Sequence, residues 1–320
     1  MPVTPRRVWR AAPGTLVVVA VFVLATGAGV PFLASLIYRR DHQLLIPWVL
    51  VGLAVVGLLY AWRFGLHPRL RATEQGVTVV NPFRALSFDW EDIRVVAPGE
   101  NGLVIASEGA RAEAWCIQKS RWATKRGRRT RADKITDELF DLLQTYDPPL
   151  EDDETGIRIR RARWDEHNLL TSIERAASKA ALHHVFPPEE YPYPTAAVRR
   201  RWRRLLRDPA VHIRVLEEFD IPVGLVAFEN SGHLRHLAIA PQYARRGYGA
   251  LLLEYATQEI FDSGAPQAEL WVLVENRDAR AFYRSQGWED TLERSDSEYP
   301  PYPREMKLAK PNPAAPRRKS

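Results

Sequence analysis

Cysteine is almost absent from this sequence, since Cys116 is the single one among 320 residues. A lone thiol excludes an internal disulfide and any metal site built from several thiolates. The eight histidines are scattered along the chain. His233 and His236 stand three residues apart in a predicted strand, so their side chains should face opposite sides. They cannot hold one metal ion together, and we expect no metal site.

A strong excess of charge is also lacking. The chain has 45 Lys and Arg against 39 Asp and Glu, which gives a formal net charge of +6. Such a mild excess suits a protein near anionic lipid or an acidic cofactor, but does not by itself indicate nucleic acid. No base-reading or base-stacking motif accompanies the arginine runs, so we do not expect nucleic acid as a partner.

Two long segments without any charged residue lie near the N-terminus, at residues 14–38 and 44–62. As helices they would span roughly 37 Å and 28 Å, against a hydrocarbon core of ~30 Å. A cleaved signal peptide is the alternative for the first segment, because arginines precede it. That segment is too long for a signal peptide, and a second follows after five residues. We predict an N-terminal arm and a two-helix transmembrane hairpin over residues 1–66.

Basic residues favour one orientation of this hairpin. They are Arg6, Arg7 and Arg10 before it, Arg63, Arg69 and Arg71 after it, and Arg39 and Arg40 in its connection. Loops rich in Lys and Arg remain on the cytoplasmic side. The sequence therefore predicts a cell-membrane protein with two spans, membrane lipid as a partner, and soluble domains in the cytoplasm.

Residues 67–147 have the pattern of a small β-rich domain. Short strand-like stretches, at 76–80, 85–90, 102–106 and 112–117, are separated by turn residues, and an amphipathic helix follows at 132–146. The stretch GVTVVNPFRALSFDWEDI resembles the PH-like domains that follow membrane hairpins in many bacterial proteins. Its ligand is left open.

Three segments lack an apolar pattern. Residues 119–134 hold eight Lys or Arg and one acid, Asp133. Either they form an electrostatic contact with anionic lipid, at about 1 kcal/mol per basic group, or they are a solvated loop. Residues 148–156, which are acidic and contain proline, read as a linker. Residues 311–320 read as a disordered tail.

Residues 157–310 alternate between strand and helix patterns. Strands are expected at 157–162, 211–218, 223–229, 233–240, 268–274 and 304–309, and helices at 165–182, 195–207, 250–261 and 276–287. Three consecutive strands with short turns predict an antiparallel meander. The order predicts an α+β domain with a mixed central sheet.

Two glycines one residue apart, Gly247 and Gly249, fall between a predicted strand and a predicted helix. A turn without Cβ atoms at a helix N-terminus lets several amides converge on a diphosphate. A dinucleotide-binding motif is excluded because Leu252 occupies its third glycine position, and a Walker loop lacks its Gly-Lys-Ser/Thr. A plain strand-to-helix turn remains the alternative.

The stretches LAIAPQYARRGYGALLL and LVENRDARAFYRSQGW, in this order, resemble the GNAT acetyltransferase superfamily. Ala244 departs from the Arg/Gln that begins the family's turn pattern. The resemblance implies acetyl-CoA as co-substrate. The residues implied to bind it are Leu237, Ala238, Ile239, Arg245, Arg246, Gly247, Tyr248, Gly249, Ala250 and Asn276.

Acetyl transfer needs an acid for the departing thiolate and a base for the acceptor amine. Tyr283 matches the family's tyrosine acid, and a core aromatic is the alternative for it. His233 stands where many family members have a glutamate base, and Glu229 is the second candidate for that base. An acidic, aromatic loop at 183–194 suits an amine acceptor, whereas the arginine-rich helix after it suits an anionic one.

We therefore predict a membrane-anchored N-acetyltransferase that transfers an acetyl group from acetyl-CoA to an amine acceptor by direct attack. The acceptor is a small molecule or a protein. The alternative is a non-catalytic membrane scaffold that binds acetyl-CoA or a partner, because Ala244 departs from the pattern and no single residue is marked as the base.

Overall fold

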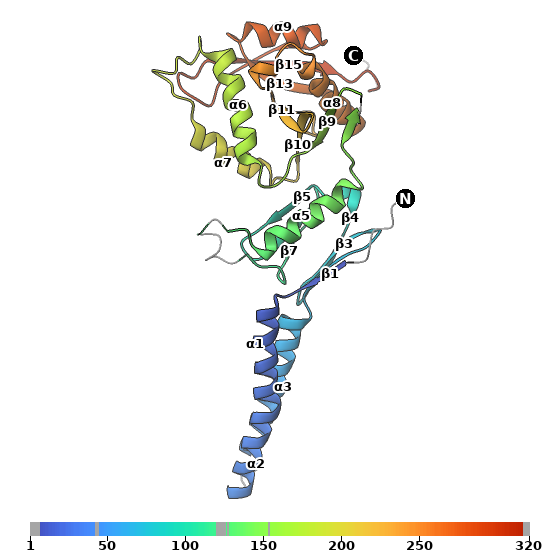
Figure 1. Cartoon of the computed structure of the whole chain (residues 1–320), viewed down its shortest axis with the longest axis vertical. Helices are drawn as coiled ribbons and strands as arrows, with labels where there is room; N and C mark the ends of the chain where they lie inside the picture. The colour runs from blue at the N-terminus through green and yellow to red at the C-terminus, as the bar shows by residue number, and fades with distance from the viewer. Residues whose placement is uncertain (1–6, 42–44, 120–125, 127, 153, 316–320) are drawn as a thin grey trace. The chain divides into compact units, whose positions relative to one another are not determined.

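The protein is described by a computed structural model over residues 7–41, 45–119, 126, 128–152 and 154–315. It divides into two compact units, Met1–Asp147 and Pro148–Ser320. Figure 1 shows the elements of each unit. We describe the units separately.

The first unit contains a pair of long apolar helices. Helices α1 (Pro13–Leu24) and α2 (Val30–Asp41) continue through a π-helical turn, Ala25–Gly29, and α3 (Leu45–Ala61) continues through another, Trp62–Leu66. By length and composition, Pro13–Leu36 and Trp48–Leu66 could each cross a membrane. Residues 42–44, which include the last two residues of the predicted connection, lie outside the described residues.

Small residues let the two helices approach each other closely. A Cβ atom added to Gly65 would lie 2.7 Å from Cγ2 of Val19, and one added to Gly57 would lie 3.5 Å from the Phe22 ring. A larger residue at Gly65 would force the helix ends apart. The helices therefore pair as a hairpin, with its open end at the β-rich part of the unit.

The residues before the hairpin do not form a separate arm. Strand β1 (Arg7–Arg10) pairs antiparallel with β2 (Arg69–Ala72), which follows the hairpin. Trp9 packs against the β-rich core, and the Arg131 guanidinium donates to the Arg10 carbonyl at 2.9 Å. The apolar helices are thus inserted between two neighbouring strands of one sheet.

The β-rich part of the first unit contains two antiparallel sheets and one helix. The sheets have the orders β1-β2-β3-β4 and β5-β6-β7. The further elements are β3 (Gly76–Val80), β4 (Ala85–Asp89), a 3₁₀ turn (Trp90–Asp92), β5 (Val95–Pro98), β6 (Leu103–Ala106), β7 (Arg111–Ala114) and α5 (Arg131–Gln144). Both sheets contribute to one apolar core together with the buried face of α5, which contains Ile135, Leu139 and Leu143.

Helix α5 begins with a capping box. The Thr130 hydroxyl accepts a hydrogen bond from the Asp133 amide, and the Asp133 carboxylate accepts one from the Thr130 amide. Lys119 also reaches Asp133, at 2.9 Å. Part of the basic segment 119–134 therefore serves the start of this helix. Residues 120–125 and 127 of that segment lie outside the described residues, so its contact with lipid stays a prediction.

The second unit is built on two antiparallel sheets that meet at one point. Their orders are β12-β11-β10-β9-β8 and β13-β15-β14. The strands are β8 (Leu150–Asp152), β9 (Ile157–Arg161), β10 (Val211–Glu218), β11 (Ile221–Glu229), β12 (Leu234–Ile239), β13 (Gln267–Leu273), β14 (Glu289–Asp296) and β15 (Arg304–Pro311). A single parallel bridge, between His233 and Glu269, joins the two sheets, so the combined sheet is mixed. The predicted meander corresponds to β10, β11 and β12.

Helices cover both faces of this sheet (Figure 1). Helices α6 (His167–Leu182) and α7 (Thr195–Leu205) pack on one face, around a core that includes the fully buried Trp202. Helix α8 (Tyr248–Asp262) and, beyond it, α9 (Arg277–Ser285) belong to the core on the other face, which includes Leu252 and Trp288. Successive β12 residues alternate between these two cores.

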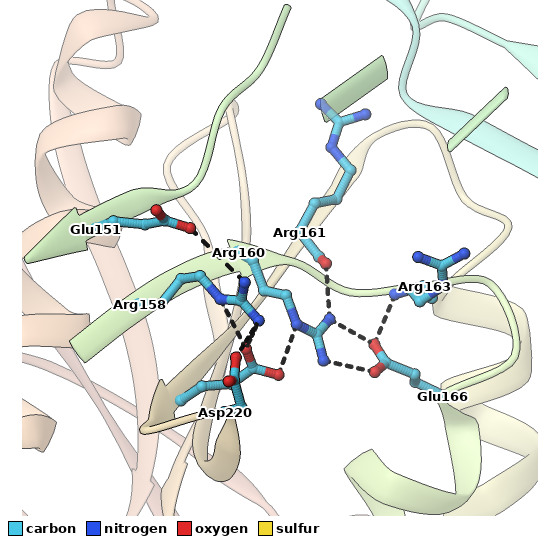
Figure 2. A network of polar contacts seen from close by, with 8 residues as sticks. Glu151, Arg158, Arg160, Arg161, Arg163, Glu166 and Asp220 are labelled. Carbon is cyan, nitrogen blue, oxygen red and sulfur yellow. Dashed lines mark hydrogen bonds and ion pairs between the residues drawn. The ribbon is translucent and has the colours of Figure 1, made fainter. Parts of the chain in front are cut away.

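The predicted linker is wrong for residues 150–152, because these form β8 and pair with β9. The basic residues of the IRIRR stretch explain why this edge is stable. Arg158 and Arg160 both donate to Glu217, a residue that is only 4% exposed, at 2.5 Å and 2.7 Å. Figure 2 shows the two arginines, with Asp220 beside Arg158 and Glu166 beside Arg160. Arg160 also binds Glu166, at 2.7 Å, and so connects the sheet to the start of α6.

The predicted disordered tail is wrong for residues 311–315. Strand β15 runs to Pro311. The Asn312 amide donates to the Pro266 carbonyl at 3.0 Å, and its side chain donates to the Ala265 carbonyl at 2.9 Å. Residues 316–320 lie outside the described residues.

The shared carboxylate of Glu217 leads to a stability prediction. In Glu217→Ala two arginines lose their common partner, and breaking a buried pair costs about 3–5 kcal/mol. We expect the free energy of unfolding to fall by an amount near the lower limit of this range, because Arg160 keeps its contact with Glu166 and Arg158 is partly exposed. The free energy of unfolding of residues 148–320, measured in urea, tests this. Asp220→Ala, which removes an exposed partner of Arg158, should cost less than about 1 kcal/mol. Equal losses for the two variants would contradict this account.

Candidate functional site

The turn between β12 and α8 has an unusual backbone. A 3₁₀ turn, Pro241–Tyr243, follows β12. Arg245 then has φ 61°, and Gly247, the N-cap of α8, has φ 89°. Both values lie in the left-handed region, which glycine adopts freely and other residues adopt at a cost of about 1 kcal/mol.

This backbone leaves a row of donors unused. Among the described residues, the amides of Arg245 through Ala250 donate no hydrogen bond, whereas the Ala244 amide donates to Pro241 and the Leu251 amide to Gly247. The residues from Arg245 to Gly247 are exposed. Six consecutive amides at a helix N-terminus form a site of positive potential that is suited to an anion.

The two glycines of the turn act differently. A Cβ added to Gly247 would meet no atom within 4 Å, so only its φ requires glycine. A Cβ added to Gly249 would make an ordinary contact with the Phe282 ring, at 3.6 Å. Neither glycine is needed for packing inside the protein. Only Gly247 is required, by its left-handed φ.

The charged side chains of the turn are not equivalent. Arg246 lies 3.4 Å from Glu218 and over the Tyr243 ring, so part of its charge is balanced. The buried Tyr248 also donates its hydroxyl proton to Glu218, and this hydrogen bond raises the pKa of Tyr248. Arg245 is exposed, and no described residue forms an ion pair with it. The predicted positive charge therefore comes mainly from Arg245 and the amides.

Strand β12 presents an open edge beside this turn. It pairs with β11 on one side, while on the other side the described residues show one bridge to β13, at His233. The Ala240 amide donates to Val223, and backbone groups alternate along an antiparallel pair. The backbone groups of Leu237 and Ile239 therefore face away from β11, whereas those of Ala238 face β11. Of the three β12 residues predicted to bind the co-substrate, two have backbone groups that are not paired with β11.

Two residues of the second predicted motif, Asn276 and Tyr283, have different structural roles. The Asn276 side chain caps α9 by accepting from the Ala279 amide at 3.2 Å, so its oxygen is already used. Tyr283 lies on α9 with its ring near Trp288, at a centroid distance of 6.0 Å. Burial alone raises the pKa of Tyr283, so its hydroxyl stays protonated. The position of Tyr283 is compatible with both predicted roles, that of the general acid and that of a core aromatic residue.

Neither predicted base lies beside the open edge. His233 stands at the bridge where β12 and β13 are joined, and its carbonyl accepts from the Glu229 amide at 2.9 Å. Burial lowers the pKa of His233, and Arg235 adds to the shift. The Glu229 carboxylate binds both Arg235 and the Ser231 hydroxyl. Their catalytic role stays a prediction.

A polar cluster on the other face of β12 was not predicted. His236 lies directly before Leu237, with its ring 5.2 Å from that of Trp202. In α6, Glu174 accepts from Arg201 at 2.6 Å and from the Trp202 indole at 2.7 Å. Burial lowers the pKa of His236 to about 4, and the neighbouring Arg201 contributes. The imidazole is therefore neutral at ordinary pH.

Two tyrosines complete this cluster. Burial raises the pKa of Tyr193, from the predicted acceptor loop, and the Glu174 charge adds to the shift. Burial also raises the pKa of Tyr299, from the segment between β14 and β15, although Arg201 opposes the shift. Five separate segments thus contribute polar groups to the cluster that contains His236, Glu174 and Arg201.

The face of the sheet on which His236 lies can be predicted only when the strand pairing is known. A β-bulge shifts the pairing of β11 and β12, so that Ala227 faces His236 while Phe228 faces Leu234. Arg235 is the extra residue. Counting along the strand cannot locate such a bulge.

The described residues contain no group of three or more His, Cys, Asp or Glu that could hold a metal ion.

Comparison with known proteins identifies two regions of the chain. The sequence model of the acetyltransferase (GNAT) family matches residues 178–288, and that of a bacterial PH domain matches residues 67–114. An aminoalkylphosphonate N-acetyltransferase of Salmonella typhimurium is 30% identical over 95 residues, which are 27% of this chain and 62% of the relative. The chain thus spans about three fifths of the length of that curated relative.

Solved structures of acetyltransferases are also similar to the chain. The PaiA N-acetyltransferase of Thermoplasma acidophilum, in complex with coenzyme A, is 17% identical, with 48% of this chain and 98% of that chain covered and a TM-score of 0.41. The ribosomal-protein-S18-alanine N-acetyltransferase of Escherichia coli is 17% identical, with 51% and 99% covered and a TM-score of 0.39. Residues 178–288 of this chain are thus similar to the acetyltransferase (GNAT) family, and residues 67–114 are similar to a bacterial PH domain.

Proposed function

We propose that the protein is a membrane-anchored enzyme that transfers an acetyl group from acetyl-CoA to an amine. GNAT enzymes use acetyl-CoA as their acetyl donor. The observation that supports the proposal most strongly is the row of six unused amides from Arg245 to Ala250. These amides bind the diphosphate of the co-substrate, and Arg245 adds a full positive charge.

The open edge of β12 continues this binding surface. Leu237 and Ile239 offer backbone donors and acceptors to the amide groups of the pantetheine arm, which binds like an added strand. This extends the co-substrate from the turn toward the bridge at His233. The thioester then lies near the middle of β12, within reach of both sheet faces. Asn276 acts mainly as a helix cap and contributes to binding by fixing α9.

Residues of the chain supply the two proton transfers. The amine nitrogen forms a bond to the thioester carbon, and the C–S bond then breaks. Tyr283 gives its proton to the departing thiolate, because its buried hydroxyl holds that proton at neutral pH. The nitrogen loses one proton to a base and the product is an amide.

His236 is the base that we propose, in place of His233 and Glu229. It precedes the first residue of the open edge and is already neutral. Its face of the sheet carries Glu174, Arg201, Tyr193 and Tyr299, where an acceptor meets polar groups. Glu229, in contrast, is bound to Arg235. A weak base of this kind removes the proton after the nitrogen has attacked, when that proton is most acidic.

The apolar helices are the membrane anchor. Their large side chains are exposed, including Val17 at 62%, Leu24 at 69% and Leu53 at 63%. Helices of the core of a soluble protein bury such residues. Contiguous exposed apolar surface of this extent is stable in hydrocarbon. We propose that the hairpin spans the membrane and holds both soluble units on the cytoplasmic side, where acetyl-CoA is available.

The first prediction concerns the turn. In Gly247→Ala the left-handed φ costs about 1 kcal/mol and misaligns the amides, so the dissociation constant for acetyl-CoA should rise about fivefold or more. Isothermal titration calorimetry on residues 148–320 measures it. Gly264→Ala is a matched control, because Gly264 has φ 91° and open space at the other end of the same helix. Equal effects of the two variants would contradict a diphosphate site.

The second prediction concerns Tyr283. Tyr283→Phe should reduce turnover by about a hundredfold, as expected for the loss of a general acid. Coenzyme A release from acetyl-CoA is measured with an aminoalkylphosphonate and other primary amines as acceptors. Acetyl-CoA affinity should stay unchanged. Unchanged turnover in the variant would instead favour the scaffold alternative.

The third prediction concerns pH. Unfolded His236 has a pKa near 6.5 and the folded value is about 4, so below pH 6.5 the unfolded chain takes up a proton that the folded chain does not. Stability should therefore fall by up to about 3 kcal/mol as the pH drops from 6.5 to 4. His236→Gln should remove most of this fall, and His183→Gln, at an exposed position, should not. Urea titrations at several pH values test this prediction. The same dependence of the unfolding free energy on pH in the unsubstituted protein and in both variants would contradict it.

A further inference from the structure

The hairpin is joined to the β-rich part of its unit by very short connections. Residues 11–12 separate β1 from α1, and residues 67–68 separate the end of the second helix from β2. Two residues span at most about 7 Å. Arg10 and Arg69 are also paired across the sheet. If the hairpin crosses the membrane, as we propose above, this end of the sheet must lie at the bilayer surface.

The turn between β3 and β4, residues 81–84, lies at the same end of the sheet. Arg69, the first residue of β2, pairs with Val80, which pairs in turn with Ala85. Phe83, at this turn, is 74% exposed. Its ring meets the Phe64 ring edge-on, at a centroid distance of 5.2 Å. Phe64 belongs to the last turn of the second apolar helix, so Phe83 extends the apolar surface of the hairpin.

Positive charge surrounds this aromatic contact. The Arg63 guanidinium lies 5.6 Å from the centre of the Phe83 ring, and the exposed Arg84 follows Phe83 directly. Burial lowers the pKa of His67, and the charges of Arg63, Arg69 and Arg71 add to the shift. Aromatic rings beside arginines match the boundary between acyl chains and anionic headgroups.

The turn is held in place by the neighbouring strand. The Asn81 side chain donates to the Glu113 carbonyl at 2.7 Å and accepts from the Trp115 amide at 3.2 Å. The Asn81 amide donates to the Arg84 carbonyl at 2.9 Å. Trp115, itself 43% exposed, is thereby fixed near the turn. These hydrogen bonds hold the turn in a conformation that exposes the Phe83 ring, and burial of that ring in an apolar environment is favourable.

We propose that residues 81–84 form a membrane wedge, in which Phe83 enters the headgroup–acyl boundary of an anionic bilayer while Arg63 and Arg84 bind lipid phosphates. The wedge gives the PH domain a third point of attachment besides the two hairpin connections. This domain then stands in one orientation on the bilayer and does not pivot about the hairpin.

Fluorescence quenching on the full chain in nanodiscs of phosphatidylcholine and phosphatidylglycerol tests this proposal. A thiol-reactive dye is attached at Ala85→Cys, next to the wedge. The native Cys116 does not interfere, because it is buried and burial raises its pKa to about 11. Gln75→Cys is the matched control, since it lies in the exposed turn at the other end of β3, about 17 Å away. Leu53→Cys, in the second apolar helix, reports on membrane insertion itself.

Nitroxides at the lipid headgroup should quench the dye at residue 85 strongly and the dye at residue 75 weakly. Adding Phe83→Ser to Ala85→Cys should reduce the quenching by about twofold or more, because the ring no longer holds the turn in the boundary. Equal quenching at 75 and 85, or no effect of Phe83→Ser, overturns the wedge. If deep nitroxides fail to quench the dye at Leu53→Cys, membrane anchoring itself is wrong and the wedge is overturned with it. Neither result affects acetyl-CoA binding by the second unit.

Discussion

The second unit depends on the incomplete backbone pairing between β12 and β13. Strands β12 and β13 are neighbours, yet within the described part of the chain they share a single bridge, between His233 and Glu269. The remaining edge of β12 keeps the backbone groups of Leu237 and Ile239 unpaired, and the chain then turns into α8 with six unused amides. An unpaired edge is normally a liability in a sheet. Here the edge and the turn offer one continuous row of backbone groups, which is what a long, polar co-substrate with a diphosphate requires.

Strong packing elsewhere maintains this opening. Apolar cores on the two faces of the sheet are centred on residues such as Trp202 and Leu252. The shared carboxylate of Glu217 ties β9 to β10, and Arg160 connects these strands to α6. These rigid surroundings hold the backbone amides of the turn in position, although the amides themselves donate no hydrogen bond within the described residues. In the proposed binding surface the principal donors are backbone amides, so the site does not require the side chain that Ala244 lacks.

Most of the elements could be predicted from the sequence, because their apolar periodicity is clear. Strand β14 could not, since it is almost entirely polar and exposed, and β8 could not, since acidic residues next to prolines are typical of linkers. Strand β1 was hidden because its arginines read as flanking charges of the hairpin. In the site, the glycine turn follows from local sequence. His236 does not, because its position depends on a bulge and on α6 and α7, which are distant in sequence.

The insertion of the hairpin between β1 and β2 has a consequence for biosynthesis. Strand β1 leaves the ribosome first, but its partner β2 emerges only after both apolar helices have been made. If the hairpin spans the membrane, as we propose, pairing of Arg7–Arg10 with Arg69–Ala72 requires the two strands to be on the same side of the bilayer. A chain with only one helix inserted cannot close this sheet. In that case, the assembly of the β-rich part of the first unit is coupled to the completed insertion of the hairpin.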